Sequence, residues 1–144
     1  MTTTPPVTGQ DLGMAQNATR ALLDDLLARA GTDFPEWLVL RLLHQRGPLS
    51  REALRDNLAA GLALHATAAD LLIGRTAARG YLRADPQDVH IGLTEAGAGR
   101  YQGLNDAVAG LTAELYAGFD QADLATTGRV LREVTRRAAA RHPR

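Results

Sequence analysis

The sequence contains neither cysteine nor lysine. The absence of cysteine excludes disulfide bonds, thiolate zinc sites, thiol redox sensors and cysteine nucleophiles. All 16 basic residues are arginines, and 16 acidic residues balance them, so the net charge is zero. An arginine guanidinium donates paired hydrogen bonds to phosphate or guanine, although a GC-rich coding sequence also explains the exclusive use of arginine. No bulk basic field points to nucleic acid, so any such role depends on local geometry.

Long apolar runs and catalytic motifs are missing as well. The longest apolar run, Trp37–Leu40, is far too short to cross a bilayer, and no segment has the pattern of a signal peptide. We therefore expect a cytoplasmic protein with no membrane partner. The histidines lack the spacing of metal ligands, and there is no glycine-rich phosphate loop or nucleophile–base pair. We expect no metal, no cofactor and no enzymatic activity.

Helical periodicity dominates the rest of the chain. Residues 1–9 are rich in threonine and proline and are expected to form a flexible tail, followed by a single domain over residues 10–144. Apolar spacing predicts a first helix that ends near Gly31 and a second that ends near Arg46. Ser50, the only serine, is expected to cap a third helix, and a fourth covers about His65 to Arg79.

Two short strands are predicted next, at Tyr81–Arg83 and residues 89–93, around a turn-rich tip. Thr94 and Asp120 are expected to cap two long final helices. In the first of these, apolar residues recur with a period near 3.5, which is typical of a seam against another helix. The predicted fold class is mainly α, a winged helix-turn-helix with a short two-stranded β-hairpin and long N- and C-terminal helices.

This order of elements has a direct use on DNA. One helix crosses the phosphate backbone, the next enters the major groove, and the hairpin reaches an adjacent groove or the backbone. The candidate DNA-binding residues run from the start of the fourth helix to the hairpin: His65, Ala66, Thr67, Asp70, Arg75, Arg79 and Arg83. For each arginine taken singly, a solvated surface charge is the alternative interpretation.

The second helix is apolar on most sides and is expected to be central. Its tryptophan, Trp37, is expected mainly in the core, with a ligand platform as the alternative. If a pocket lies beside this helix, Trp37, Arg41 and His44 are the candidate ligand-binding residues, the latter two as polar contacts for an anion.

Several motifs resemble the MarR family of bacterial regulators. They are Leu49-Ser50 at a helix start, Arg79-Gly80-Tyr81-Leu82, Leu93-Thr94-Glu95-Ala96-Gly97 after the hairpin, and Val130-Leu131 in the final helix. The Leu-Thr-Glu-Ala-Gly box is the most specific of them, and the resemblance covers about Leu12 to Ala139.

The resemblance implies a homodimer whose dimerisation helices are residues 10–31 and 94–140, with a DNA-reading lobe over residues 34–94. The expected interface residues are Leu12, Leu22, Leu111, Leu115 and Leu131. It also implies a repressor that binds double-stranded DNA at an inverted-repeat operator. A small lipophilic or aromatic anionic ligand in a cleft between the dimer helices and the lobe would release the DNA.

Three features depart from the family pattern. About four extra residues lie around Ala59–Leu62, Thr76 stands where an apolar residue is usual, and the hairpin tip carries Asp85 and Asp88 in place of an arginine. Charges across Gly47–Thr94 also cancel, with five arginines against five acidic residues. The alternative function is therefore a dimeric ligand-binding or protein-interaction module on the same scaffold, with a degenerate DNA lobe.

Overall fold

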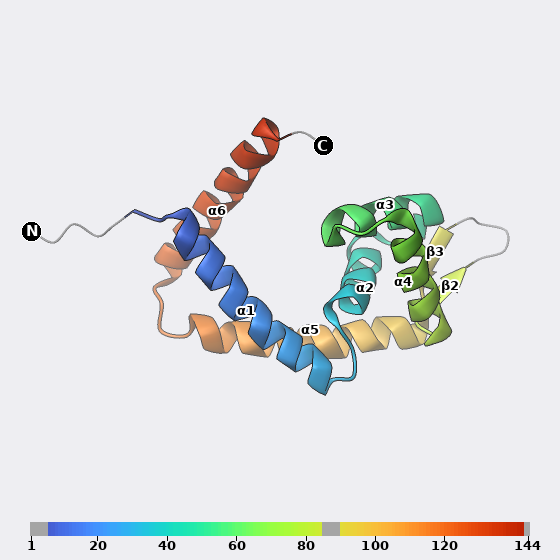
Figure 1. Cartoon of the computed structure of the whole chain (residues 1–144). Coiled ribbons are helices and arrows are strands. Elements are labelled where there is room, and N and C mark those ends of the chain that lie inside the picture. Colours follow the sequence, from blue (N-terminus) through green and yellow to red (C-terminus); the bar gives the residue numbers. More distant parts are fainter. Residues whose placement is uncertain (1–5, 85–89, 143–144) are drawn as a thin grey trace, which may run out of the picture. The chain divides into compact units, whose positions relative to one another are not determined.

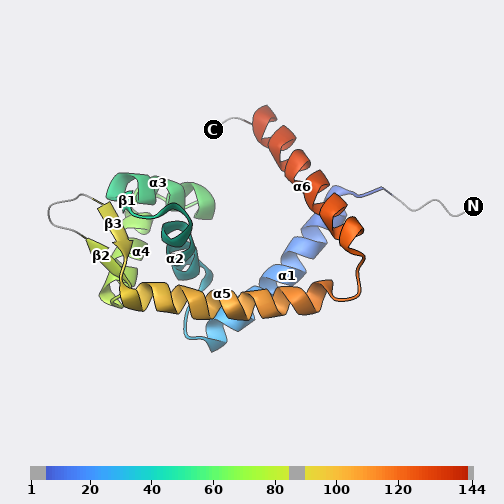
Figure 2. The ribbon, with the colours of Figure 1, turned by 180° about the vertical axis from the view of Figure 1, so that it is seen from behind.

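The computed structural model describes residues 6–84 and 90–142. The chain divides into two units, Met1–Ala109 and Gly110–Arg144. Figures 1 and 2 together show the elements, of which β1 is labelled in Figure 2. In chain order they are α1 (Gly9–Arg29), α2 (Phe34–Arg46), β1 (Leu49–Ser50), α3 (Arg51–Leu62), α4 (Ala66–Ala78), β2 (Leu82–Ala84), β3 (His90–Leu93), α5 (Glu95–Tyr116) and α6 (Gln121–Arg141). The prediction of a mainly α winged helix-turn-helix is confirmed.

Short polar side chains fix where the helices begin. Thr8 and Asp11 form a capping box at α1, with the Asp11 amide donating to the Thr8 hydroxyl over 3.2 Å. The Thr8 backbone N–H and hydroxyl donate to the carboxylate of Asp11, which lowers the pKa of that carboxyl. Helix α1 thus begins inside the stretch predicted as a tail, of which residues 1–5 lie outside the described part. Ser50 caps α3, as predicted, and Asp33 caps α2.

Helices α3 and α4 form the helix-turn-helix. Their axes differ in direction by 110° across the three-residue turn Ala63–His65, which is the geometry of this motif. Ala63 takes the left-handed conformation with φ of +53° and caps α3, since its amide donates to the Ala59 carbonyl. The extra residues around Ala59–Leu62 are the last turn of α3.

The sheet has three strands where the sequence predicted two. Its order is β1-β3-β2, with both pairs antiparallel. Leu82 pairs with Leu93, as a hairpin requires, and Leu49 pairs with Ile91 to add the third strand. The predicted two-stranded hairpin is confirmed in β2 and β3. Strand β1 was not predicted, because two residues are too few to show the alternating pattern from which strands are predicted.

The first hydrophobic cluster builds the lobe. It joins α2, α3, α4 and the sheet, which lie together in Figures 1 and 2, through buried side chains that include Val39, Leu43, Leu54, Leu58 and Ile73. Thr76 is fully buried beside this cluster, and its hydroxyl donates to the Leu72 carbonyl over 2.8 Å. This internal bond satisfies the hydroxyl, which explains how threonine replaces the expected apolar residue.

The second cluster connects α1, α2 and the first half of α5. Its buried members are Leu27, Trp37, Leu40, Tyr101 and Leu104. Trp37 is therefore a core residue, as expected. Among the described residues no single helix is long and apolar enough to span a membrane; α3 and α4 pass that test only when taken together as a bent pair.

Candidate DNA-reading lobe and ligand site

The start of α4 is an open surface. His65 is the N-cap residue, and its side chain makes no capping hydrogen bond within the described structure. Ala66 and Thr67 are exposed beside it. The first turn of α4 contains no acidic residue, so its positive dipole end is available to an anion such as a phosphate. Three of the predicted DNA-binding residues therefore lie together on one accessible surface.

Asp70 lies between two arginines of α3. Its carboxylate oxygens are 3.7 Å from the Arg51 guanidinium and 3.6 Å from that of Arg55. Two cations thus share one half-buried anion, and the group keeps one net positive charge at the junction of α3 and α4. Asp70, a predicted DNA contact, is thus paired with α3 in this structure.

Arg75 and Arg79 point back to the start of α2. Arg75 donates to the Asp33 carboxylate over 3.1 Å, with both side chains about half exposed. Arg79 is 3.3 Å from the Glu36 carboxylate and also donates to the Gly31 carbonyl over 3.2 Å. These arginines fasten the end of α4 to α2, a role that the sequence did not predict.

Glu36 is a buried acidic residue that was not among the candidate site residues. Its side chain is only 2% exposed, and its carboxylate also accepts a hydrogen bond of 2.7 Å from the Thr32 hydroxyl. Glu36 does not cap α2, since Asp33 performs that role by accepting the Glu36 amide. A glutamate in the first turn of a helix is ordinary, so only the position of Arg79 in space reveals the buried pair.

Arg83 is the predicted contact on the wing, which is the hairpin of strands β2 and β3. It is exposed on β2, and its guanidinium lies across Gly92 of the neighbouring strand, 3.4 Å from where a β-carbon would be. Asp85 and Asp88, which the sequence placed at the tip of the hairpin, lie outside the described residues.

The Leu93–Gly97 box ties α5 to the wing. The Thr94 hydroxyl donates to the Gly80 carbonyl over 2.6 Å and accepts the Gly97 amide over 3.0 Å, while the Thr94 amide donates to the Tyr81 carbonyl. At Gly97 a β-carbon would lie 2.2 Å from the Tyr81 carbonyl oxygen. Only glycine fits this contact, which gives the last position of the motif its physical reason.

The three candidate ligand residues gather on one side of α2. The Arg41 guanidinium lies 5.4 Å from the Trp37 ring centroid, and His44 stacks on Tyr101 with centroids 4.3 Å apart. Trp37 is 6% exposed, and its indole Nε1 is buried with no hydrogen-bond partner among the described residues. A buried donor of this kind favours an acceptor atom beside it.

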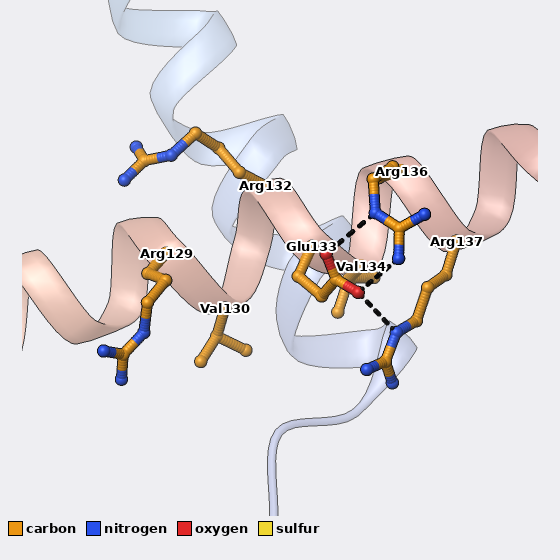
Figure 3. A pocket seen from close by; sticks show the side chains of 7 residues that line it. All are labelled: Arg129, Val130, Arg132, Glu133, Val134, Arg136 and Arg137. Atoms are coloured by element: carbon orange, nitrogen blue, oxygen red, sulfur yellow. Dashed lines mark hydrogen bonds and ion pairs between the residues drawn. The ribbon is translucent and has the colours of Figure 1, made fainter.

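The predicted interface leucines remain uncovered. Leu12, Leu22, Leu115 and Leu131 are exposed, and Leu111 is half-buried. None of the described residues of α6 is buried. An open hollow of about 690 Å³ lies along this helix and is lined by its own residues alone, among them Val130 and Val134 (Figure 3). Helices in proteins gain most of their stability from packing of an apolar face, and the described residues of α6 show no such buried face.

Charges frame this hollow on α6. The Glu133 carboxylate lies between Arg136, at 2.6 Å, and Arg137, at 2.8 Å (Figure 3). Hydrogen bonds from Arg136 first, and then from Arg137, lower the pKa of the Glu133 carboxyl. Across the described residues, no group of three histidine or acidic side chains is arranged to hold a metal ion.

These elements form a winged helix-turn-helix fold, and several solved structures share it. A MarR family protein of Mycobacterium tuberculosis, in complex with DNA, matches with a TM-score of 0.72 and 19% identity over 90% of this chain and 98% of that chain. Apo wild-type MarR of E. coli matches with a TM-score of 0.70 and 19% identity, over 92% and 98%. A MarR family protein of M. tuberculosis in complex with salicylic acid gives 0.66 and 20%, over 90% and 99%.

No protein-family model and no curated protein matches the sequence. The chain has the winged helix fold of the MarR family proteins, and it covers nearly the full length of these structures.

Proposed function

We propose that this chain is a DNA-binding transcriptional regulator that works as a homodimer. Helix α4 enters the major groove, and strands β2 and β3 carry Arg83 toward the backbone. Two copies related by a twofold axis bind an inverted-repeat operator, as dimeric helix-turn-helix proteins do. The observation that carries the proposal is the exposed start of α4, held at 110° to α3 and followed by the wing. The similar M. tuberculosis structure in complex with DNA supports it.

The uncovered apolar surfaces support the dimer. Exposed leucines occur on α1 in the first unit, and exposed leucines and valines occur on the end of α5 and on α6 in the second. Such surfaces are typical of helices that pack against another copy. The expected role is repression. A small aromatic or lipophilic anion beside Trp37 relieves it by favouring a lobe spacing that does not fit the operator.

DNA binding is expected to depend on salt and on Arg83. With duplex DNA from upstream of the chain's own gene, a gel shift is expected to show a discrete complex that contains two chains. Affinity falls as salt rises because bound arginines release counterions from the phosphates. Arg83→Ala should weaken binding to all sequences alike and reduce the salt slope by about one phosphate contact.

Arg141→Ala is the matched control, because it removes the same charge from the end of α6. It should bind DNA as the wild type does. A complex that forms equally well with Arg83→Ala would place the wing away from DNA. Absence of a complex at low salt, both with this duplex and with a randomised duplex library, would refute the regulator function.

Ligand binding is expected to change the fluorescence of Trp37, the only tryptophan. Titration with salicylate should quench its emission until the site is saturated. The reason is that a carboxylate or phenol oxygen of the ligand accepts a hydrogen bond from Nε1 and replaces apolar groups next to the indole. Arg41→Ala should weaken this binding by about tenfold, as expected for one lost charged contact. Arg46→Ala, which removes a charge from the last turn of the same helix, is the control. Linear quenching without saturation would show that salicylate does not bind at a site beside Trp37.

A second candidate function is a dimeric ligand-binding or protein-interaction module. It is favoured by Arg75 and Arg79, which are engaged with Asp33 and Glu36 inside the lobe. A dimer in solution that binds salicylate but shifts no DNA at any salt would establish this alternative.

A further inference from the structure

The exposed face of α4 is apolar. Thr67, Leu71, Gly74 and Ala78 follow one another at spacings of four, three and four residues, so they form one strip along the helix, and all four are exposed. Leu71 is the most prominent, with 71% of its surface exposed, although a leucine at this position gains nothing from water. The buried face of the same helix is already complete without it, through Ala69, Leu72, Ile73 and Thr76.

The charged side chains of α4 are directed elsewhere. Arg75 pairs with Asp33, Arg79 pairs with buried Glu36, and Asp70 faces the two arginines of α3. The strip therefore offers one hydroxyl and otherwise only methyl groups and bare backbone. The usual readers of guanine and adenine, arginine and asparagine or glutamine, are missing from it.

The major groove has one apolar group that matches such a strip, the 5-methyl group of thymine. We infer that α4 reads its half-site through thymine methyl groups that pack against Leu71 and the methyl group of Thr67. The operator half-sites are accordingly rich in A·T pairs where they face this strip. This inference rests on the proposed function and adds the class of sequence that is bound.

Neighbouring features fit a duplex better than another apolar partner. Arg51 and Arg55 share a single anion next to the strip, and the positive dipole end of α4 begins it, which together suit flanking phosphates. At Gly74 a β-carbon would meet nothing within 4 Å, so base edges can approach the backbone there. A G·C pair has no methyl group in the major groove, so it lacks the apolar contact that an A·T pair offers to this strip.

The test replaces thymine by deoxyuridine, which removes only the methyl group. Duplexes are first selected from a randomised library with the wild-type protein, and their affinity is then measured by fluorescence anisotropy at fixed salt. We expect A·T-rich half-sites, and a loss of about fourfold for each thymine replaced at a position facing the strip. Deoxyuridine in the flanking DNA should change nothing.

A variant separates contact from DNA shape. Leu71→Ala should bind the selected duplex about tenfold more weakly, and deoxyuridine should then cost it little, because the group that met the methyl is gone. Val7→Ala, equally exposed and outside the lobe, is the control and should behave as the wild type.

The outcomes distinguish the two levels of the argument. Selected sites that need guanine at the centre of the half-site, or affinity indifferent to deoxyuridine, would overturn the thymine inference while the regulator function stands. An unchanged affinity of Leu71→Ala would overturn it too and would assign this leucine to a protein partner. Failure to select any duplex would refute the regulator function itself.

Discussion

Replacing Gly97 by alanine is expected to destabilise the protein by about 3 kcal/mol, because overpacking against rigid backbone is costly. The added β-carbon would lie 2.2 Å from the Tyr81 carbonyl oxygen and 3.0 Å from its carbonyl carbon. Neither atom belongs to a flexible side chain, so α5 must shift away from the wing. That shift also strains the hydrogen bonds of Thr94 to Gly80 and Tyr81.

Thermal unfolding followed by circular dichroism measures this loss, at one fixed protein concentration because the melting temperature of the proposed dimer depends on concentration. We expect a decrease of about 10 °C. Gly99→Ala, two residues further along the same helix, is the matched control. A β-carbon at Gly99 meets nothing within 4 Å, so alanine should stabilise the helix by about 0.5–1 kcal/mol. Equal melting of Gly97→Ala and wild type would contradict the close approach of α5 to the wing.

Features that depend on neighbouring residues are those that the sequence predicts well. Helix order and the cap at Ser50 follow from local periodicity and short polar residues. Such signals arise within a few neighbouring residues, so a single sequence contains them. The two-residue strand β1 depends on pairing with β3, and no local pattern indicates it.

The candidate site was less predictable, because its charges are set by contacts across long stretches of sequence. The Arg75–Asp33 and Arg79–Gly31 contacts join residues 42 and 48 positions apart. A helical pattern shows that these arginines are exposed or at an edge, but it does not show which way a long side chain turns. Leu71 could have been noticed, since its position lies opposite the inward residues of α4, yet only its exposure shows that nothing in its own unit covers it.

The second large effect concerns the arginine that meets buried Glu36. Arg79→Ala should destabilise the protein by about 2 kcal/mol, because it leaves a carboxylate in the core with a single hydroxyl partner. This loss of stability is smaller than for a fully buried ion pair, because the Arg79 side chain is 40% exposed. Arg75→Ala, one turn earlier, breaks a pair whose two side chains are each 49% exposed, and it should cost at most about 0.5 kcal/mol.

Urea unfolding of both variants measures the difference, and a double variant identifies its cause. If the stranded charge is responsible, Glu36→Gln added to Arg79→Ala should recover part of the lost stability, since a neutral amide keeps a partner in Thr32 without a buried charge. The same coupling has a functional consequence, because the pair holds the end of α4 against α2. Arg79→Ala should then weaken DNA binding but leave the salt slope unchanged. Loss of a phosphate contact would instead lower the slope. A lowered slope with unchanged stability would instead place Arg79 on the phosphate backbone.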